Sequence, residues 1–341
     1  MAEQKIDACI IPSADPHMSE YFSDHWKTRA FVSGFSGSAG TLVITREMSG
    51  LWTDGRYYVQ AAGELSGSEI QLFRASEPDC PSPTAYLSKE LPEGSVIGFN
   101  GQLFSAAAVE KMEKDFSRRS MKTRIHVDFA NDIWEDRPAE TLTPVYLLDT
   151  CYTGRSASEK LEMVRGALKK ADADAIAVSK LDNIAWLFNI RSNDVEDNPV
   201  VISYAFVSPE EAVLFTDSSR VPADVRDSLA KEGVTFLPYD EIYAFLAART
   251  QKNRVLCDKN ELNYSLYHAV EENAALTAVP GTDPIFLLKA CRPGTPTTPT
   301  ARTAAPWRSS TAGSLRSWKK ARSSPNGTAP KSWRSSAASS P

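Results

Sequence analysis

The sequence contains the stretch Leu51-Trp-Thr-Asp-Gly-Arg56 and, later in the chain, a related stretch, Leu214-Phe-Thr-Asp-Ser-Ser-Arg220. Each follows the same series of features: an apolar strand, a connecting segment and a second strand. The first series starts with the strand Ile6–Pro12 and the second with Asp174–Ser179. Counted from the aspartate of the first strand to the threonine of the quoted stretch, the two series span 46 and 42 positions. Matching order and spacing predict two duplicated α/β domains, because solenoid repeats are much shorter.

Apolar runs and turn residues predict the elements of each domain. In chain order we expect a helical stretch at 17–22, a glycine turn at 34–40, strands at 41–45 and 95–100, a helix at 181–189, an irregular segment at 191–198, and strands at 199–207 and 254–258. The domains are expected to join near 149–154, before a helix that starts with a capping box of Ser156 and Glu159. We therefore assign the first domain to residues 1–152, the second to 153–291 and a tail to 292–341.

The composition is typical of a soluble globular protein, with 42% hydrophobic and 24% charged residues. No stretch approaches the ~20 apolar residues of a membrane span, and the first apolar run is too short for a signal peptide. The five cysteines are scattered and form no C-x-x-C pair, which favours isolated reduced thiols over a disulfide framework. These features predict a cytoplasmic protein that does not associate with membranes.

The tail at 292–341 differs sharply from the rest of the chain. It carries nine basic residues, no acidic residue, one leucine and no Ile, Val, Met, Phe or Tyr. Such a segment cannot bury enough apolar area to offset the entropy of ordering it, so the sequence predicts disorder. The basic residues form no dense run beyond Lys319-Lys320, so we expect no specific nucleic-acid binding.

Motifs for nucleotide, nucleophile and metal chemistry are missing from the sequence. The glycine turn at 34–40 matches neither G-x-x-x-x-G-K-[ST] nor G-x-G-x-x-G, and no G-x-S-x-G surrounds its serines. We interpret it as a tight strand connection that requires positive φ. The four histidines, His17, His25, His126 and His268, are dispersed and show no metal-ligand spacing. We expect them to be surface or capping residues.

Arg56 is the candidate binding residue. It follows Asp54-Gly55, a turn signal, so residues 53–57 are expected to form a sharp corner at a strand end. A corner can present the planar guanidinium outward, where it suits a peptide carboxylate or carbonyl. The alternatives are a local pair with Asp54 or a side chain that covers apolar surface.

Several long segments together resemble the start of Xaa-Pro aminopeptidases (aminopeptidase P), which belong with creatinase and prolidase. The resemblance runs in order over residues 6 to 291. The matching segments are Ile10-Ile-Pro-Ser-Ala-Asp-Pro-His17, Arg29-Ala-Phe-Val-Ser-Gly-Phe-Ser-Gly-Ser-Ala-Gly-Thr41, Leu51-Trp-Thr-Asp-Gly-Arg-Tyr57, Ile133-Trp-Glu-Asp-Arg-Pro138, Asp182-Asn-Ile-Ala-Trp-Leu-Phe-Asn-Ile-Arg191 and Asp194-Val-Glu-Asp-Asn-Pro-Val200.

The resemblance implies two creatinase-type N-terminal domains, each a mixed sheet flanked by helices, followed by a pita-bread catalytic domain. That catalytic domain would hold two metal ions, usually manganese, bound by two Asp, one His and two Glu. The metals activate a water that attacks the peptide bond before a proline in the second position. The resemblance also implies that Arg56 contacts bound peptide. A homodimer is a possible assembly.

The resemblance ends at Cys291. After it the family continues into an acidic helix and the catalytic domain, whereas this chain turns into the basic tail. We interpret the tail as a frame-shift product; a genuine linker is the alternative. No metal ligand of the family is carried over, so we expect a truncated, non-catalytic metallo-aminopeptidase without a cofactor of its own.

A stand-alone binding or scaffold module with a disordered basic arm is the other hypothesis. The encoding DNA would distinguish the two. Another open frame past codon 291 that encodes an acidic helix and metal-binding motifs would support the aminopeptidase reading.

Overall fold

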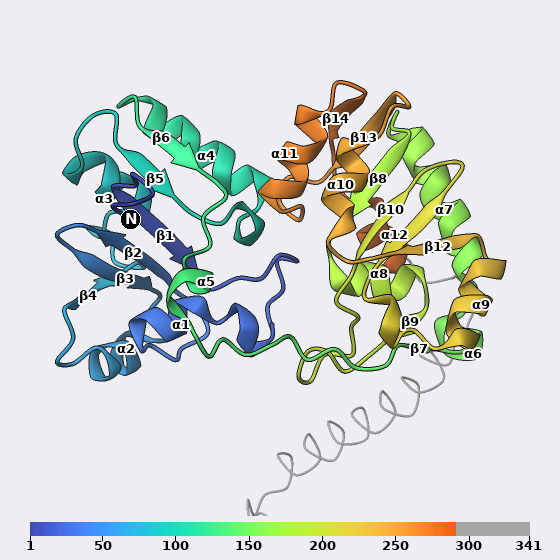
Figure 1. Ribbon diagram of the computed structural model, residues 1–341, viewed down its shortest axis with the longest axis horizontal. Coiled ribbons are helices and arrows are strands. Elements are labelled where there is room, and N and C mark those ends of the chain that lie inside the picture. The colour runs from blue at the N-terminus through green and yellow to red at the C-terminus, as the bar shows by residue number, and fades with distance from the viewer. Residues whose placement is uncertain (291–341) are drawn as a thin grey trace, which may run out of the picture. The chain divides into compact units, whose positions relative to one another are not determined.

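The computed structural model describes residues 1–290, except for the side chain of Asp132. Residues 1–148 and 155–290 belong to one compact unit, which contains two six-stranded sheets flanked by helices (Figure 1). The segment 149–154 groups outside that unit and holds helix α6 (Thr150–Thr153), capped by the Asp149 carboxylate. The disorder predicted for 292–341 concerns residues outside the described part of the chain.

The first sheet has the order β4-β3-β2-β1-β5-β6. Strand β1 pairs antiparallel with β2, β2 antiparallel with β3, and β3 parallel with β4, while β1, β5 and β6 pair in parallel. The bounds are β1 (Ala8–Pro12), β2 (Thr41–Thr45), β3 (Ser49–Thr53), β4 (Ile70–Arg74), β5 (Val96–Gly98) and β6 (Lys122–Arg124).

The second sheet repeats this topology strand for strand, in the order β12-β11-β10-β8-β13-β14. Each pairing has the same direction as its counterpart in the first sheet. The predicted duplication of a mixed α/β domain is therefore confirmed. The bounds are β8 (Ala175–Val178), β10 (Tyr204–Val207), β11 (Ala212–Phe215), β12 (Val234–Leu237), β13 (Asn253–Cys257) and β14 (Leu276–Pro280).

Helices connect the strands in both halves. We call the elements from β1 to α5 module I and those from α7 to α12 module II. Module I contains η1 (Asp24–Trp26), α1 (Thr28–Ser33), α2 (Tyr58–Glu64), α3 (Pro83–Glu90), η2 (Gly101–Leu103), α4 (Ala106–Ser117) and α5 (Phe129–Ile133). Module II contains α7 (Ala157–Lys170), α8 (Leu181–Leu187), η3 (Ser218–Arg220), α9 (Ala223–Lys231), α10 (Glu241–Ala247), α11 (Tyr264–Glu272) and α12 (Pro284–Ala290). A small antiparallel pair joins β7 (Tyr146–Leu147) to β9 (Ile190–Arg191). No helix in residues 1–290 has the length and apolarity to cross a bilayer.

Buried residues alternate between the two faces of each sheet, as the two-residue period of a strand requires. In β1, Ala8 and Ile10 belong to one hydrophobic cluster, whereas Cys9 and Ile11 belong to another. In β8, Ala175 and Ala177 face the same cluster as Ala8 and Ile10. One continuous apolar core is therefore built from both modules.

The start of α4 depends on module II. The first backbone N–H groups of a helix have no partner within that helix. Here Ala106 N–H donates to the Leu262 carbonyl at 3.0 Å and Ala107 N–H to the Lys259 carbonyl at 2.8 Å. The carbonyl of Phe104 in turn accepts from Tyr264 N–H at 2.8 Å. Module II thus satisfies backbone groups of module I.

The helix predicted at 17–22 is wrong, and the first α-helix of module I begins at Thr28. The Asp15 carboxylate accepts the N–H groups of His17 at 3.1 Å and Ser19 at 2.8 Å, which closes a turn instead of a helix. Met18 has φ 53°, in the left-handed region that interrupts a right-handed helix. The segment from Ser13 to Phe22 is therefore an irregular loop.

The strand predicted at 199–207 forms only from Tyr204 onward. Upstream of it, Ile202 N–H donates to the Asp194 carboxylate and the Val200 carbonyl accepts from the Ser192 hydroxyl. These side-chain bonds replace strand pairing. The predicted capping box is confirmed at the start of α7, where Ser156 and Glu159 exchange both bonds.

Candidate functional site

All strands of the first sheet except β2 run in the same direction, so their carboxyl ends lie at one edge. β1, β3 and β4 run in the same direction, so Pro12, Thr53 and Arg74 end together. Ligands of α/β sheets usually bind at such an edge, because the loops that follow the strands converge there. We call it the carboxyl edge. Two adjoining hollows of about 450 and 500 Å³ open along it and share Ser13, Glu20, Phe22 and Ser38.

Arg56 stands at a corner of this edge. β3 ends at Thr53, the Asp54 carbonyl accepts Tyr57 N–H at 3.0 Å, and α2 begins at Tyr58. The predicted sharp corner is confirmed, and it leads into a helix rather than back into a strand. Asp54 itself lines one of the two hollows.

The Arg56 side chain is exposed and paired with its neighbour. Its Nε donates to Asp54 Oδ1 at 2.9 Å and its Nη2 to Oδ2 at 2.8 Å, while 71% of the side chain stays accessible. Hydrogen bonds from Arg56 hold the pKa of Asp54 below its usual value. Asp54 occupies two of the five guanidinium N–H groups, and within residues 1–290 no further acceptor bonds to this side chain. The local pair with Asp54 thus leaves donors for a ligand.

Arg29 fixes the glycine loop beside the corner. Only 4% of Arg29 is exposed, and its guanidinium donates to the Phe35 and Gly37 carbonyls and to the Ser13 hydroxyl. Burial lowers the pKa of Arg29 to about 10. Sequence reasoning did not single out Arg29, because its partners are backbone carbonyls with no side-chain signature.

Gly34 and Gly37 serve different purposes in this loop. Gly34 has φ 70°, as predicted for the turn, and ends α1. Gly37 is required by close packing instead: a Cβ there would lie 2.3 Å from Cζ of Phe35 and 2.8 Å from Cδ1 of Tyr57. The loop is therefore held against the rings, and the Ser38 hydroxyl lies 2.6 Å from that of Tyr57.

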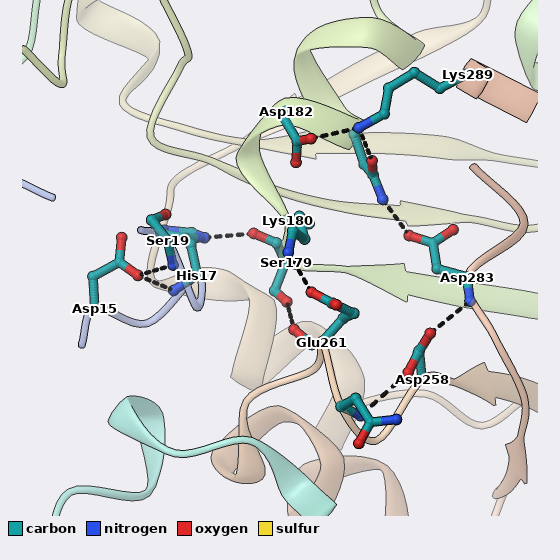
Figure 2. A network of polar contacts seen from close by, with 12 residues as sticks. Asp15, His17, Ser19, Ser179, Lys180, Asp182, Asp258, Glu261, Asp283 and Lys289 are labelled. Atoms are coloured by element: carbon teal, nitrogen blue, oxygen red, sulfur yellow. Dashed lines mark hydrogen bonds and ion pairs between the residues drawn. The ribbon is translucent and has the colours of Figure 1, made fainter. Parts of the chain in front are cut away.

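The loop Ser13–Phe22 forms another wall of the hollows, and His17 anchors it to module II. His17 is 2% exposed; its Nδ1 lies 2.7 Å from the Ser179 carbonyl and its Nε2 lies 2.8 Å from the Tyr239 hydroxyl. Figure 2 shows His17 between Asp15 of its own loop and Ser179 of module II. The expectation that all four histidines are surface or capping residues is wrong for His17.

The counterpart of Arg56 in module II is Arg220, at the end of the related stretch. Whereas Arg56 is exposed, Arg220 is buried. Its side chain is 5% exposed and forms an ion pair with Asp194, whose side chain is 0% exposed. It also donates to the Ile202 carbonyl at 2.8 Å and the Thr216 hydroxyl at 2.9 Å. The same corner therefore carries a buried structural arginine in module II and an exposed one in module I.

A second polar network ties the last described helix to α8 (Figure 2). The Asp283 carboxylate accepts Asn183 Nδ2 at 2.7 Å and the N–H of Ile285 at 2.8 Å, and Lys289 donates to Asn183 and Asp182. Burial raises the pKa of Asp283 to about 6. This network positions α12. Its residues are distant in sequence from those of module I that form the carboxyl edge.

Residues 1–290 contain no group of three or more His, Cys, Asp or Glu side chains that could hold a metal ion. The described residues therefore do not supply the ligand set that the resemblance implies. Cys9, Cys80, Cys151 and Cys257 are free thiols, as predicted, and Cys291 lies outside the described residues. The carboxyl edge could therefore bind a ligand through charged and hydrogen-bonding side chains.

Two family models match the chain, and both describe the creatinase/prolidase N-terminal domain. One covers residues 1–137 and the other residues 136–295.

Relatives and a solved structure agree with this match. Aminopeptidase P2 of Arabidopsis thaliana is 38% identical over 267 residues, which are 76% of this chain and 37% of the relative. Xaa-Pro aminopeptidase ApepP of Drosophila melanogaster is 40% identical over 241 residues, 70% of this chain and 39% of the relative. The crystal structure of X-prolyl aminopeptidase from Caenorhabditis elegans, a cytosolic enzyme with a di-nuclear active site, matches with a TM-score of 0.79 and 33% identity. That match covers 85% of this chain and 48% of the other. The chain thus spans about two-fifths of the length of these curated relatives.

Proposed function

Because the chain belongs to the aminopeptidase P family and comprises its two creatinase-type N-terminal domains, we propose that its carboxyl edge receives part of a peptide substrate. In this proposal the guanidinium of Arg56 donates to a carbonyl or carboxylate of the peptide. The complete protein removes an N-terminal residue that precedes proline. Its catalytic domain would follow the two modules and hold two metal ions, and this chain alone does not cleave peptides.

One observation carries the proposal: Arg56 is exposed and bonded to Asp54, which lines a hollow, whereas its counterpart Arg220 is buried in an ion pair. A purely structural role would favour burial of both arginines. The description of both matching models as N-terminal domains supports the proposal that these two modules do not themselves carry out catalysis. We further propose a cytoplasmic location, a homodimer, and domain limits at 152/153 and 291/292.

Binding of a labelled peptide tests the role of Arg56. The probe is Ala-Pro-Ala-Lys with fluorescein on its lysine, and the readout is fluorescence anisotropy with the full chain. Arg56→Ala is expected to raise Kd about five- to tenfold, the range of a charge-assisted hydrogen bond at an exposed site. Arg56→Lys is expected to restore part of the affinity, since it keeps the charge and loses the planar fork.

Arg46→Ala is the matched control. Arg46 is also exposed, at 67%, and pairs with Asp7 in the same module. Its replacement is expected to leave Kd unchanged. Equal effects of the two alanine variants would show only a general dependence on positive charge and would refute the assignment of Arg56.

A further inference from the structure

The loop Ser13–Phe22 is held to module II by contacts that are far apart in the sequence. Besides the two bonds of the His17 ring, Asn263 Nδ2 donates to the Pro16 carbonyl at 2.8 Å. The ring of His17 also packs on that of Tyr204, with centroids 4.6 Å apart. The middle of the loop is therefore fixed by module II, although the loop belongs to module I.

The bonds of His17 define its tautomer. A carbonyl oxygen can only accept, so Nδ1 carries the proton that it donates to Ser179. The neutral ring then accepts at Nε2 from the Tyr239 hydroxyl. Both ring nitrogens are used, and a second proton on Nε2 would place a buried positive charge on the ring and require the Tyr239 hydroxyl to turn and accept.

The same loop supplies walls of both hollows at the carboxyl edge. Ser13, Glu20 and Phe22 line both, and Tyr21 lines the larger one. Glu20, which lines both hollows, follows His17 by only three residues in the same loop. The Ser13 hydroxyl, at the start of the loop, accepts from the Arg29 that fixes the glycine loop.

We propose that His17 is a positioning residue for peptide binding, through which module II sets the shape of the carboxyl edge. This inference rests on the proposed function of that edge. His17 does not touch the peptide; it acts through the loop that carries Glu20 and Phe22. Its neutral form is the one that holds the loop.

The charges around His17 make this contact sensitive to acid. Tyr204 and Tyr239 pack against the ring, and the negative charges of Asp15 and Glu140 act on it. Burial outweighs these two carboxylates and lowers the pKa of His17 below 6.5. A released loop would expose the ring and restore the ordinary pKa, so proton binding favours release as the pH falls below about 6.5.

The test measures Kd for the same labelled peptide at pH 7.5 and 5.5, with the full chain. For the unmodified protein we expect Kd to rise at least threefold at pH 5.5. His17→Gln, which keeps a donor and an acceptor but does not titrate, is expected to raise Kd at pH 7.5 about threefold and to remove the pH dependence. Tyr239→Phe keeps the aromatic packing and removes one bond, so it is expected to weaken binding at pH 7.5. Tyr267→Phe, in the same module, is the matched control and is expected to leave Kd unchanged.

Hydrogen exchange of residues 13–22 gives a readout without peptide. Exchange in this loop is expected to be faster in His17→Gln and in the unmodified protein at pH 5.5, after correction for intrinsic rates. Unchanged Kd, pH profile and exchange in His17→Gln would overturn the proposal for His17, while Arg56-dependent binding would keep the proposed function intact. No peptide binding by the unmodified protein would overturn both.

Discussion

Arg56 and Arg220 occupy equivalent corners of the two modules, and mutation can test whether one is exposed and the other structural. Replacement of Arg220 by alanine would leave the Asp194 carboxylate buried without its ion pair, although Thr143 and Ile202 still donate to it. Removal of one partner of a buried ion pair typically costs about 3 to 5 kcal/mol. With a urea m-value of about 3 kcal/mol per M, the unfolding midpoint is expected to fall by about 1 to 1.7 M.

Arg56→Ala is expected to behave differently, because Arg56 is mostly exposed and its partner Asp54 remains hydrated. Its urea midpoint should stay within about 0.2 M of the unmodified protein, as for most surface positions. The assay is urea unfolding followed by far-UV circular dichroism, with both variants measured in the same buffer.

A double variant separates the lost ion pair from lost packing. Arg220→Met combined with Asp194→Asn removes both charges and keeps similar volumes, so it should be more stable than Arg220→Ala alone. A fall of less than 0.3 M for Arg220→Ala, or of more than 0.7 M for Arg56→Ala, would refute the assignment of a structural and an exposed arginine.

Three further predictions follow from the packing, a buried carboxyl and the proposed lack of catalysis. Gly37→Ala should destabilise the protein by about 1 to 3 kcal/mol, because its Cβ would overlap the buried Phe35 ring. Gly63→Ala in α2 is the control; its Cβ has open space, so the change should be neutral or slightly stabilising. Equal unfolding midpoints of the two variants would contradict this prediction. Burial raises the pKa of Asp283 in the folded protein from 3.8 to about 6, so its contribution to stability is full below 3.8 and is lost as the pH rises through 6. Asp283→Asn should remove roughly 2 kcal/mol of this pH-dependent change between pH 4 and 7, and parallel stability–pH curves would show that the carboxyl does not titrate there. The purified chain should release no N-terminal residue from Xaa-Pro peptides with or without Mn²⁺; turnover that scales with protein and disappears with a chelator would disprove it.

Local patterns were sufficient for the order of strands along the chain and for several turns. The apolar runs, the capping box of Ser156 and the corner after Thr53 each depend on residues close in sequence, and the structure contains all three. The duplication was also predicted from matching order and spacing, whereas the order of the strands within each sheet was not.

Contacts between distant segments explain most of the errors. The burial of His17 was not predicted, because its partners, Ser179 and Tyr239, lie 162 and 222 residues away. The helix expected there is replaced by a turn that the nearby Asp15 closes. Arg29 was missed for a related reason: it binds carbonyl groups, which every residue possesses. The exposure of Arg56 and the burial of Arg220 also depend on three-dimensional context, since the two stretches are similar in sequence. Whether Arg56 contacts peptide stays a prediction.

The dependence of α4 on carbonyls of module II has a consequence during protein synthesis. Ala106 leaves the ribosome about 150 residues before Leu262, which supplies its acceptor. At typical rates of 5–20 residues per second, this delay is roughly 8 to 30 s. During that interval the N–H groups of Ala106 and Ala107 lack the carbonyl acceptors that they have in the folded protein. The nascent first half therefore completes its folding only after most of the second half has been translated.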